Sequence, residues 1–232
     1  MAKKLLFCLP YAGSGASVYR SWISRLDGYV TVVPIQLPGR EEAYSREMPS
    51  TFHELVFELS NSMESHLDEA TSHWSIFGHS QGAILAYECA RALIRRGHGG
   101  FGQVWVSASP SPLMVERELH EQSVEVIAKN RHAQNPIIED SATDDEFWMR
   151  PLISDLKLRR TYIFNDAEPK FIEIRALIGD QDMGVTSQVA LAWQEHCVGA
   201  LEIQQVEGDH FYVRDNPDQV IELLRRAYGD RN

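Results

Sequence analysis

The chain has 232 residues, of which 44% are hydrophobic and 24% are charged, and its formal net charge at pH 7 is −11. This composition is typical of a globular protein with a sizeable core, and we expect a single domain over residues 1–232. The acidic balance argues against nucleic acids and anionic membranes as general partners, because both carry negative charge. No apolar run approaches the roughly 18 residues that would cross a bilayer.

The three cysteines, Cys8, Cys89 and Cys197, form an odd number without the spacing of a zinc site. We interpret them as reduced, mostly buried thiols of a cytoplasmic protein. The N-terminus superficially resembles a signal peptide, because Lys3 and Lys4 precede a short apolar run. A Gly-rich loop follows that run without a cleavage pattern, so the run is interpreted as a first strand.

Apolar and β-branched runs alternate with segments of helical periodicity along the chain. In chain order we expect a strand at 5–10, a helix at 18–26, a strand at 30–35, a helix at 52–67, a strand at 74–77, a helix at 81–95, strands around 104–106 and at 171–178, a helix at 186–196, a strand at 201–206 and a helix from 217 to 228. Thr51 is a possible cap of the second helix. The alternation predicts an α/β fold with a mostly parallel sheet and helices on both faces.

The stretch from about 113 to 165 breaks this alternation. It is long and polar, and it contains Pro136 and Pro151. We expect a helical insertion that lies over the carboxyl edge of the sheet. That edge is where open α/β sheets bind their ligands.

Residues 78–82 read GHSQG, which matches the G-x-S-x-G pattern of serine hydrolases. The motif follows an apolar strand and begins a predicted helix, which is the context that the pattern requires. Ser80 would lie on a sharp, strained turn that exposes its hydroxyl, while Gly78 and Gly82 remove side chains where strand and helix approach. A glycine-rich turn with a capping serine could produce the same letters, but the strand–motif–helix context favours a nucleophile.

The base should follow the nucleophile, because α/β-hydrolases carry their triad in the order Ser, Asp or Glu, His. Five histidines follow Ser80, and four of them lie after a helix end, in the predicted insertion or inside a predicted helix. His210 alone lies in a loop between a predicted strand and the last helix. A loop histidine is ordinarily a solvated side chain, but together with Ser80 it is the predicted general base.

The acid should come from a loop after an intervening strand, and residues 179–182, GDQD, form such a loop. We favour Asp182 over Asp180 because it lies farther into the loop and reaches closer to His210. Asp180 stays the alternative, since an aspartate in a turn often bonds backbone amides. Asp209 adjoins His210 and cannot easily turn back to its ring. The acid would orient the imidazole and stabilise its cationic form.

The oxyanion of a tetrahedral intermediate needs preorganised backbone amides. We expect them from Gln81, the residue after the nucleophile, and from Ala12 in the loop after the first strand. A rival interpretation of that loop is a dinucleotide site, because Gly13 and Gly15 follow a strand. It fails because Val18 occupies the place of the third glycine or alanine, and no acidic residue ends the second strand. We therefore predict no cofactor, and no cluster of metal ligands is apparent.

Six segments together are similar to those of type II thioesterases, the editing enzymes that accompany polyketide and nonribosomal peptide synthases. They are LPYAG at 9–13, QLPGRE at 36–41, GHSQG at 78–82, PLISD at 151–155, GDQD at 179–182 and GDHF at 208–211. The resemblance covers residues 5 to 215, and the first two segments in this order are more specific than GHSQG. The chain departs from the usual pattern by reading Gly-Ser-Gly at 13–15 and by lacking glycines at 131–136, which leaves its acyl preference open.

The resemblance implies the α/β-hydrolase fold with a mobile helical lid formed by the insertion. It also implies hydrolysis of acyl thioesters on the phosphopantetheine arm of carrier proteins, which clears aberrant or stalled intermediates or misprimed carriers. The enzyme itself would need no cofactor. The resemblance supports Ala12 and Gln81 as oxyanion donors, and Asp155 matches an acidic position of the family that we expect to be structural.

Carrier proteins are commonly acidic, so basic side chains of the insertion are candidates to contact one, although they could equally be ordinary solvated residues. These are Lys129, Arg131, Lys157, Arg159 and Arg160. Three alternative functions remain open: a chain-releasing thioesterase or cyclase of the same fold, a general carboxylesterase or lipase, and a binding module without catalysis. The intact Ser80, Asp182 and His210 argue against the last of these. A monomer is the default expectation.

Overall fold

The computed structural model describes residues 3–118, 145–165 and 173–229. Its centre is a six-stranded sheet with the strand order β2-β1-β3-β4-β5-β6. The strands are β1 (Lys3–Leu9), β2 (Thr31–Pro34), β3 (Thr71–His79), β4 (Phe101–Ser107), β5 (Ile174–Gly179) and β6 (Glu202–Val206). All five neighbouring pairs are parallel, which confirms the predicted sheet.

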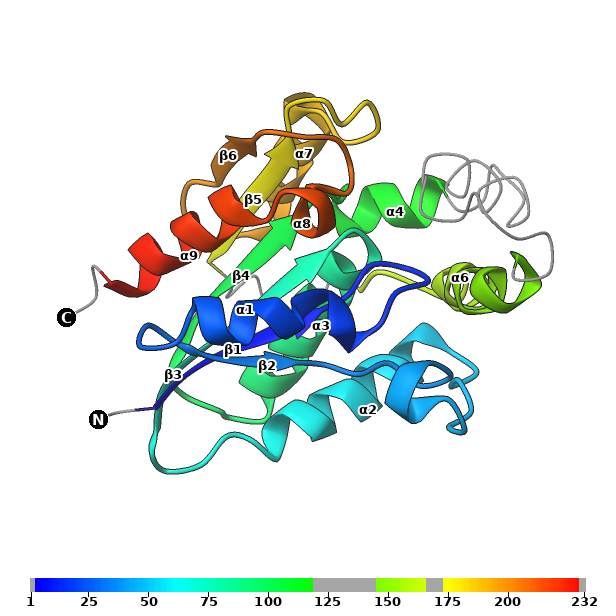
Figure 1. Cartoon of the computed structure of the whole chain (residues 1–232), viewed down its shortest axis with the longest axis horizontal. Helices are drawn as coiled ribbons and strands as arrows, with labels where there is room; N and C mark the ends of the chain where they lie inside the picture. Colours follow the sequence, from blue (N-terminus) through cyan, green and yellow to red (C-terminus); the bar gives the residue numbers. More distant parts are fainter. Residues whose placement is uncertain (1–2, 119–144, 166–172, 230–232) are drawn as a thin grey trace.

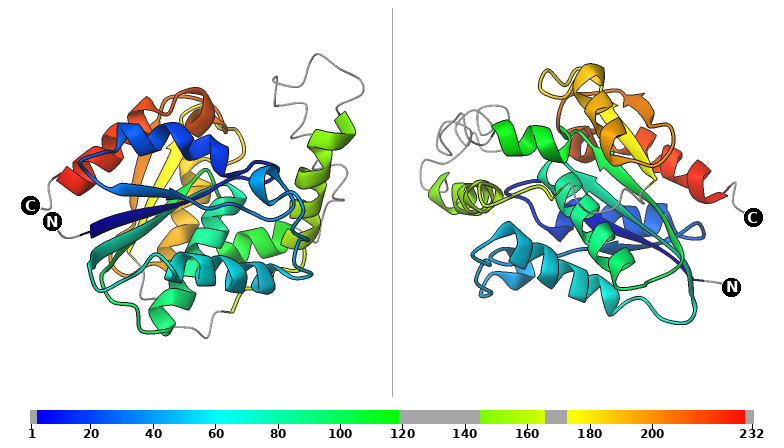
Figure 2. Two further views of the ribbon diagram at one scale, coloured as in Figure 1. Left: turned by 60° about the horizontal axis from the view of Figure 1, so that its bottom comes forward. Right: turned by 180° about the vertical axis from the view of Figure 1, so that it is seen from behind.

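Helices cover both faces of this sheet, as a parallel sheet requires. The 3₁₀-helix η1 (Ala16–Tyr19), α1 (Arg20–Arg25) and α9 (Asp218–Gly229) lie on one face, and α2 (Phe52–Glu64) and α3 (Gln81–Arg95) lie on the other (Figure 1; Figure 2, left). The helix expected at 186–196 is divided into α7 (Ser187–Ala190) and the 3₁₀-helix η4 (Leu191–His196). Two short elements were not predicted, η2 (Glu41–Ala43) and α8 (Tyr212–Asp215).

The two faces bury separate cores, and β1 shows how the sequence divides them. Its residues Leu5, Phe7 and Leu9 pack into the core under α2 and α3. Its residues Leu6 and Cys8 pack into the core under α1 and α9. Successive side chains of a strand point to opposite faces, so a strand buried on both faces is apolar throughout. This explains why the run at 5–10 is continuous rather than alternating.

Helix α2 begins where the sequence predicts. The Thr51 hydroxyl accepts a hydrogen bond from the Glu54 N–H at 3.2 Å, and the Glu54 carboxylate accepts one from the Thr51 N–H at 3.1 Å. This reciprocal pair is a capping box, which satisfies two backbone donors that the first turn would leave without partners. The helix ends at Glu64, three residues before the predicted end.

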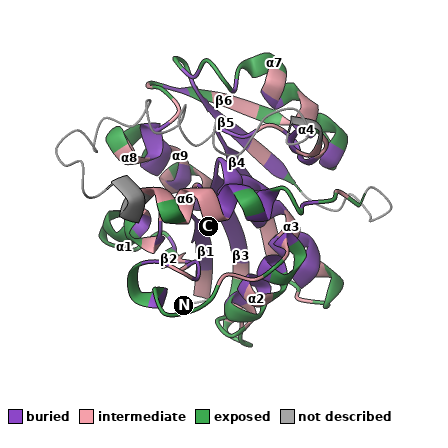
Figure 3. Cartoon of the chain, turned by 90° about the vertical axis from the view of Figure 1, so that its right-hand side faces the viewer, coloured by how far each residue is buried: buried purple, intermediate pink, exposed green. Residues whose placement is uncertain are grey.

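The predicted insertion is helical at both described ends, as α4 (Pro112–Glu118) and α6 (Asp145–Arg159). Residues 119–144 lie outside the described part of the chain. Helix α6 continues through Pro151 and lies across the carboxyl ends of the strands (Figure 3). The chain termini lie at the opposite end of the molecule (Figure 1). Within the described residues, no helix is long and apolar enough to cross a membrane.

Candidate active site

Ser80 lies in the turn between β3 and α3. Its backbone angles, φ 54° and ψ −118°, are in a region that non-glycine residues seldom adopt. The Ser80 N–H donates to the Ser107 carbonyl at 2.7 Å, which fixes the turn to the end of β4. The sequence thus produces the strained turn that the motif predicts, directly at the carboxyl edge of the sheet.

The two motif glycines leave room for close backbone contacts. A Cβ atom at Gly78 would lie 2.0 Å from the Gly82 carbonyl oxygen. A Cβ atom at Gly82 would lie 2.3 Å from the Leu9 carbonyl oxygen and 2.6 Å from that of Pro10. Only glycine fits at these positions, because such approaches are far inside van der Waals contact. Gly82 therefore allows α3 to pack directly against the loop that follows β1.

His210 connects Ser80 with Asp182. Its Nε2 lies 3.2 Å from Ser80 Oγ, and its Nδ1 lies 2.7 Å from Asp182 Oδ2. An ionised carboxylate only accepts hydrogen bonds, so Nδ1 carries the proton and Nε2 faces the serine hydroxyl as an acceptor. The three residues come from the loops after β3, β5 and β6, which meet at one edge of the sheet.

The second oxygen of Asp182 accepts hydrogen bonds from the N–H groups of Gly184 and Val185, at 2.9 and 3.0 Å. Burial on its own would raise the pKa of Asp182. The hydrogen bond from His210, the electrostatic attraction of its imidazole and the two backbone N–H groups outweigh burial and hold the pKa of Asp182 below its usual value. Asp180 instead accepts from the Gly208 N–H at 2.9 Å, and so joins the loops after β5 and β6.

His79 is a site residue that sequence reasoning missed. Its Nε2 lies 2.7 Å from the His210 carbonyl oxygen, and its Nδ1 lies 2.7 Å from Ser107 Oγ. A carbonyl only accepts, so Nε2 is protonated, and in the neutral ring Nδ1 accepts from the serine hydroxyl. Ser107 Oγ is also 2.5 Å from the Tyr212 hydroxyl, whose pKa is raised by burial. This network anchors the backbone of His210 to the residue before Ser80, and a buried histidine gives no sequence signal for it.

The two predicted oxyanion donors come from the loop after β1 and from the start of α3. Ala12 is buried in the loop after β1, and that loop packs on Gly82 of α3, while Gln81 is the first residue of α3. In the described parts of the chain, the hydrogen bonds include none donated by the backbone N–H of either residue. The assignment of these two amides as oxyanion donors therefore stays a prediction.

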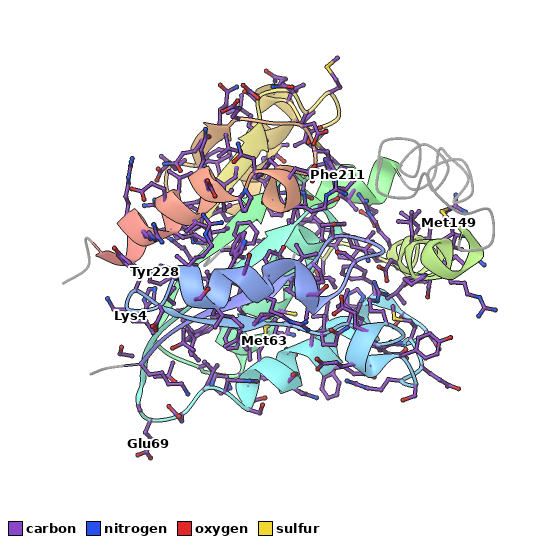
Figure 4. The ribbon with its side chains drawn as sticks, in the orientation of Figure 1. Lys4, Met63, Glu69, Met149, Phe211 and Tyr228 are labelled. Atoms are coloured by element: carbon purple, nitrogen blue, oxygen red, sulfur yellow. The ribbon has the colours of Figure 1, made fainter. Side chains whose placement is uncertain are left out.

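A cavity of about 320 Å³ opens at Ser80 and His210. Its other lining residues come from the loops after β4, β5 and β6 and from α6: Ala108, Ser109, Pro110, Arg159, Gln181, Asp182, Met183, Gly184, Val185, Asp209 and Phe211. Phe211 and Met149 of α6 lie toward this end of the molecule, whereas Lys4 and Tyr228 lie at the other (Figure 4). The cavity gives a substrate access to the serine hydroxyl.

The prediction of Arg159 as a surface residue for a partner is wrong. Only 5% of it is exposed, and it lines the cavity. It lies on the inner side of α6, because that helix has its carboxyl-terminal turns packed against the body of the protein. Lys157 and Arg160 are exposed, as expected. Lys129 and Arg131 lie outside the described residues.

The three cysteines are free and buried, as predicted. Burial raises the pKa of Cys8 and of Cys89, which keeps both as neutral thiols. Among the residues that the structure describes, no group of three or more His, Cys, Asp or Glu side chains is arranged to hold a metal ion.

Known proteins resemble this chain over nearly its whole length. The model of the thioesterase domain family matches residues 4–228. The gramicidin S biosynthesis protein GrsT of Aneurinibacillus migulanus is 28% identical over 229 residues, which cover 96% of this chain and 88% of that protein. The structure of the RedJ thioesterase from the prodiginine pathway of Streptomyces coelicolor has a TM-score of 0.82 and 28% identity, and the match covers 98% of this chain and 85% of that one. The type II thioesterase BorB from the borrelidin cluster has a TM-score of 0.80 and 28% identity, with 96% and 91% covered. Because the family match extends from β1 to the end of α9, this chain belongs to the thioesterase family and has its α/β-hydrolase fold.

Proposed function

We propose that this chain is a type II thioesterase that hydrolyses acyl groups from the phosphopantetheine arm of carrier proteins, and so frees a polyketide or nonribosomal peptide synthase of aberrant or stalled intermediates. The observation that carries the proposal is the hydrogen-bonded series Ser80–His210–Asp182 at the mouth of a cavity. The similarity to GrsT, RedJ and BorB supports the substrate class.

In the first step, Ser80 Oγ attacks the thioester carbonyl carbon while His210 Nε2 takes the hydroxyl proton. The N–H groups of Ala12 and Gln81 bind the oxygen that becomes negative. The tetrahedral intermediate collapses by breaking the carbon–sulfur bond, and the phosphopantetheine thiol leaves with the proton from His210. Asp182 holds the imidazole in the required tautomer and stabilises its cation.

In the second step, His210 Nε2 takes a proton from a water molecule that attacks the acyl-serine carbonyl. The bond from the carbonyl carbon to Ser80 Oγ then breaks, Ser80 Oγ takes the proton back from His210, and the free acid leaves. A thiolate is a better leaving group than an amine, so proton delivery to the sulfur matters less than in amide hydrolysis. Oxyanion stabilisation and access of water to the acyl-enzyme should then contribute more to the rate. The chain needs no cofactor of its own in this scheme, since the pantetheine arm belongs to the partner.

The decisive experiment uses a carrier protein loaded with an acetyl-phosphopantetheine arm. We expect rapid loss of the acetyl group, followed by intact mass, and we expect the Ser80→Ala variant to release none above background. An unchanged carrier together with labelling of Ser80 by an organophosphonate would contradict the editing function. That result would favour a chain-releasing enzyme, recognised by a cyclised product from a long acyl chain, or a carboxylesterase, recognised by faster turnover of oxygen esters.

The exposed Lys157 of α6 and Arg160, which directly follows that helix, are the remaining described candidates for contact with an acidic carrier. Reversing both charges, as Lys157→Glu with Arg160→Glu, should raise KM for the carrier-bound thioester about tenfold. It should leave hydrolysis of a free acyl-pantetheine unchanged, because that small substrate makes no contact with the carrier surface. Equal effects on both substrates, or none on either, would count against this docking surface.

We further propose that the protein acts as a monomer in the cytoplasm. The free, buried state of Cys8, Cys89 and Cys197 fits a reducing compartment. Sedimentation of the purified chain at micromolar concentration would test the monomer, because a dimer would sediment at twice the mass.

A further inference from the structure

Helix α6 contacts the loop that carries the proposed oxyanion donor Ala12. Asp155 of α6 is fully buried, and its Oδ2 accepts a hydrogen bond from the Gly13 N–H at 2.7 Å. Gly13 has φ +84°, and a Cβ atom there would lie 3.1 Å from the Leu152 Cβ of the same helix. Helix α6 thus lies directly against the backbone of the loop, and the contact joins segments that are 142 residues apart in the chain.

Arg40 fixes the same carboxylate and the same loop. Its guanidinium donates to both oxygens of Asp155, with Nη1 at 2.6 Å from Oδ2 and Nη2 at 2.5 Å from Oδ1. Nη1 also lies 3.1 Å from the Ser14 carbonyl oxygen. The pair therefore holds the loop by two groups, the N–H of Gly13 and the C=O of Ser14. Bidentate pairing of this kind adds geometric specificity to its energy.

The arrangement decides which backbone amide can serve the oxyanion. The Gly13 N–H is occupied by Asp155, whereas the N–H of Ala12, one residue earlier, donates no hydrogen bond in the described part of the chain. Because a peptide unit is planar, fixing the Gly13 N–H also fixes the plane between Ala12 and Gly13. The adjoining plane, which carries the Ala12 N–H, is joined to it through the two backbone torsions of Ala12, so the bond to Asp155 limits the directions that this N–H can take.

Fold stability alone does not account for such a pair, because a buried ion pair is often no more stabilising than apolar residues of the same volume. We infer that Arg40 and Asp155 are positioning residues, which orient the Ala12 N–H toward the oxyanion. Because Asp155 belongs to α6, the orientation of this N–H then depends on the position of that helix. This inference rests on the proposed function, and it adds that a helix of the insertion supports the oxyanion site by holding the loop that carries Ala12.

The test compares Asp155→Asn with the wild type in hydrolysis of acetyl-carrier and in binding of a trifluoromethyl ketone analogue of acetyl-pantetheine. In that analogue a methylene separates sulfur and carbonyl, so Ser80 adds to the ketone to form a hemiketal oxyanion and nothing leaves. We expect kcat to fall about 10- to 100-fold with KM nearly unchanged, since loss of a whole oxyanion donor costs about 10²- to 10³-fold. Affinity for the ketone should fall by the same factor as kcat.

Two further variants keep the test decisive. Arg40→Lys retains a positive charge but not the two-pronged contact, so it should show the same pattern to a smaller degree even if Asp155→Asn folds poorly. Glu88→Gln removes the charge from a different, partly buried pair, in which Glu88 Oε1 lies 3.1 Å from Arg91 Nη1 on α3. It should lower the unfolding temperature without changing kcat or ketone affinity.

Folded Asp155→Asn and Arg40→Lys proteins with wild-type kcat and ketone affinity would overturn the inference. So would a fall in kcat without a matching fall in ketone affinity, because the defect would then lie elsewhere than at the oxyanion. A wild-type protein that neither hydrolyses acetyl-carrier nor binds the ketone would instead refute the proposed function, so the two failures are distinguishable.

Discussion

Replacing Ser80 with alanine should lower kcat/KM for acetyl-carrier by about 10⁴-fold or more, which is the scale measured for loss of a serine nucleophile. The substitution removes the hydroxyl oxygen that lies 3.2 Å from His210 Nε2. Fold stability should change little, because alanine and serine tolerate the strained backbone of residue 80 about equally. The measurement is release of the acetyl group by intact mass under multiple-turnover conditions, alongside the unfolding temperature.

Binding of the trifluoromethyl ketone gives a second comparison between the wild type and this variant. The wild type should bind the ketone as a hemiketal, whereas Ser80→Ala cannot form the hemiketal although its cavity is intact. A Ser80→Ala protein that kept a tenth or more of wild-type turnover would show that another group performs the hydrolysis. A variant that lost its activity together with its fold would show up in the unfolding temperature, and Ser80→Gly would then test the same point.

The second large effect is expected at the acid. Asp182→Asn should lower kcat by about 10⁴-fold, because an asparagine amide can donate to His210 Nδ1 and thereby stabilise the wrong tautomer of the imidazole. Asp180→Asn is the matched control. Its side-chain oxygen can still accept from the Gly208 N–H, which lies 2.9 Å from Asp180 Oδ1, and its activity should stay close to that of the wild type.

The pH dependence of stability gives a second test of the role of Asp182. Asp182 has a lowered pKa in the folded protein, so its contribution to stability is fully present above the pKa of the unfolded chain, about 4, and is lost as the pH falls through the lower folded value. The gap in unfolding temperature between the wild type and Asp182→Asn should therefore narrow below about pH 4. Equal activity losses in the two variants would contradict the assignment of Asp182.

The sequence was most informative where local chemistry determines the structure. A continuous apolar run predicted β1, and glycines on either side of Ser80 predicted the turn, because each signal depends on neighbouring residues. The choice of His210 and Asp182 used only chain order and loop position, and the structure brings both into hydrogen-bonding distance of their partners.

What the sequence could not predict depends on contacts between distant residues. Arg159 is on the cavity side of α6, but that helix has only a weak apolar stripe, so its pattern does not show which side faces inward. The Arg40–Asp155 pair joins residues 115 positions apart. His79 resembles an ordinary motif residue until its hydrogen bond to the His210 carbonyl is seen. Each of these is a polar group that the fold buries, and composition does not reveal such burial.

The two bonds to His210 from successive residues have a consequence for the timing of catalysis. His79 bonds to the backbone carbonyl of His210, and Ser80 faces the His210 ring. The base is therefore held in place by the same short segment that carries the nucleophile. The translational and rotational freedom that the two groups would have to lose on meeting is already absent in the folded protein. The histidine need not be recruited when a substrate arrives, and it is still in place when the acyl-serine awaits its water. No part of the catalytic cycle should therefore be spent on bringing the base to the nucleophile.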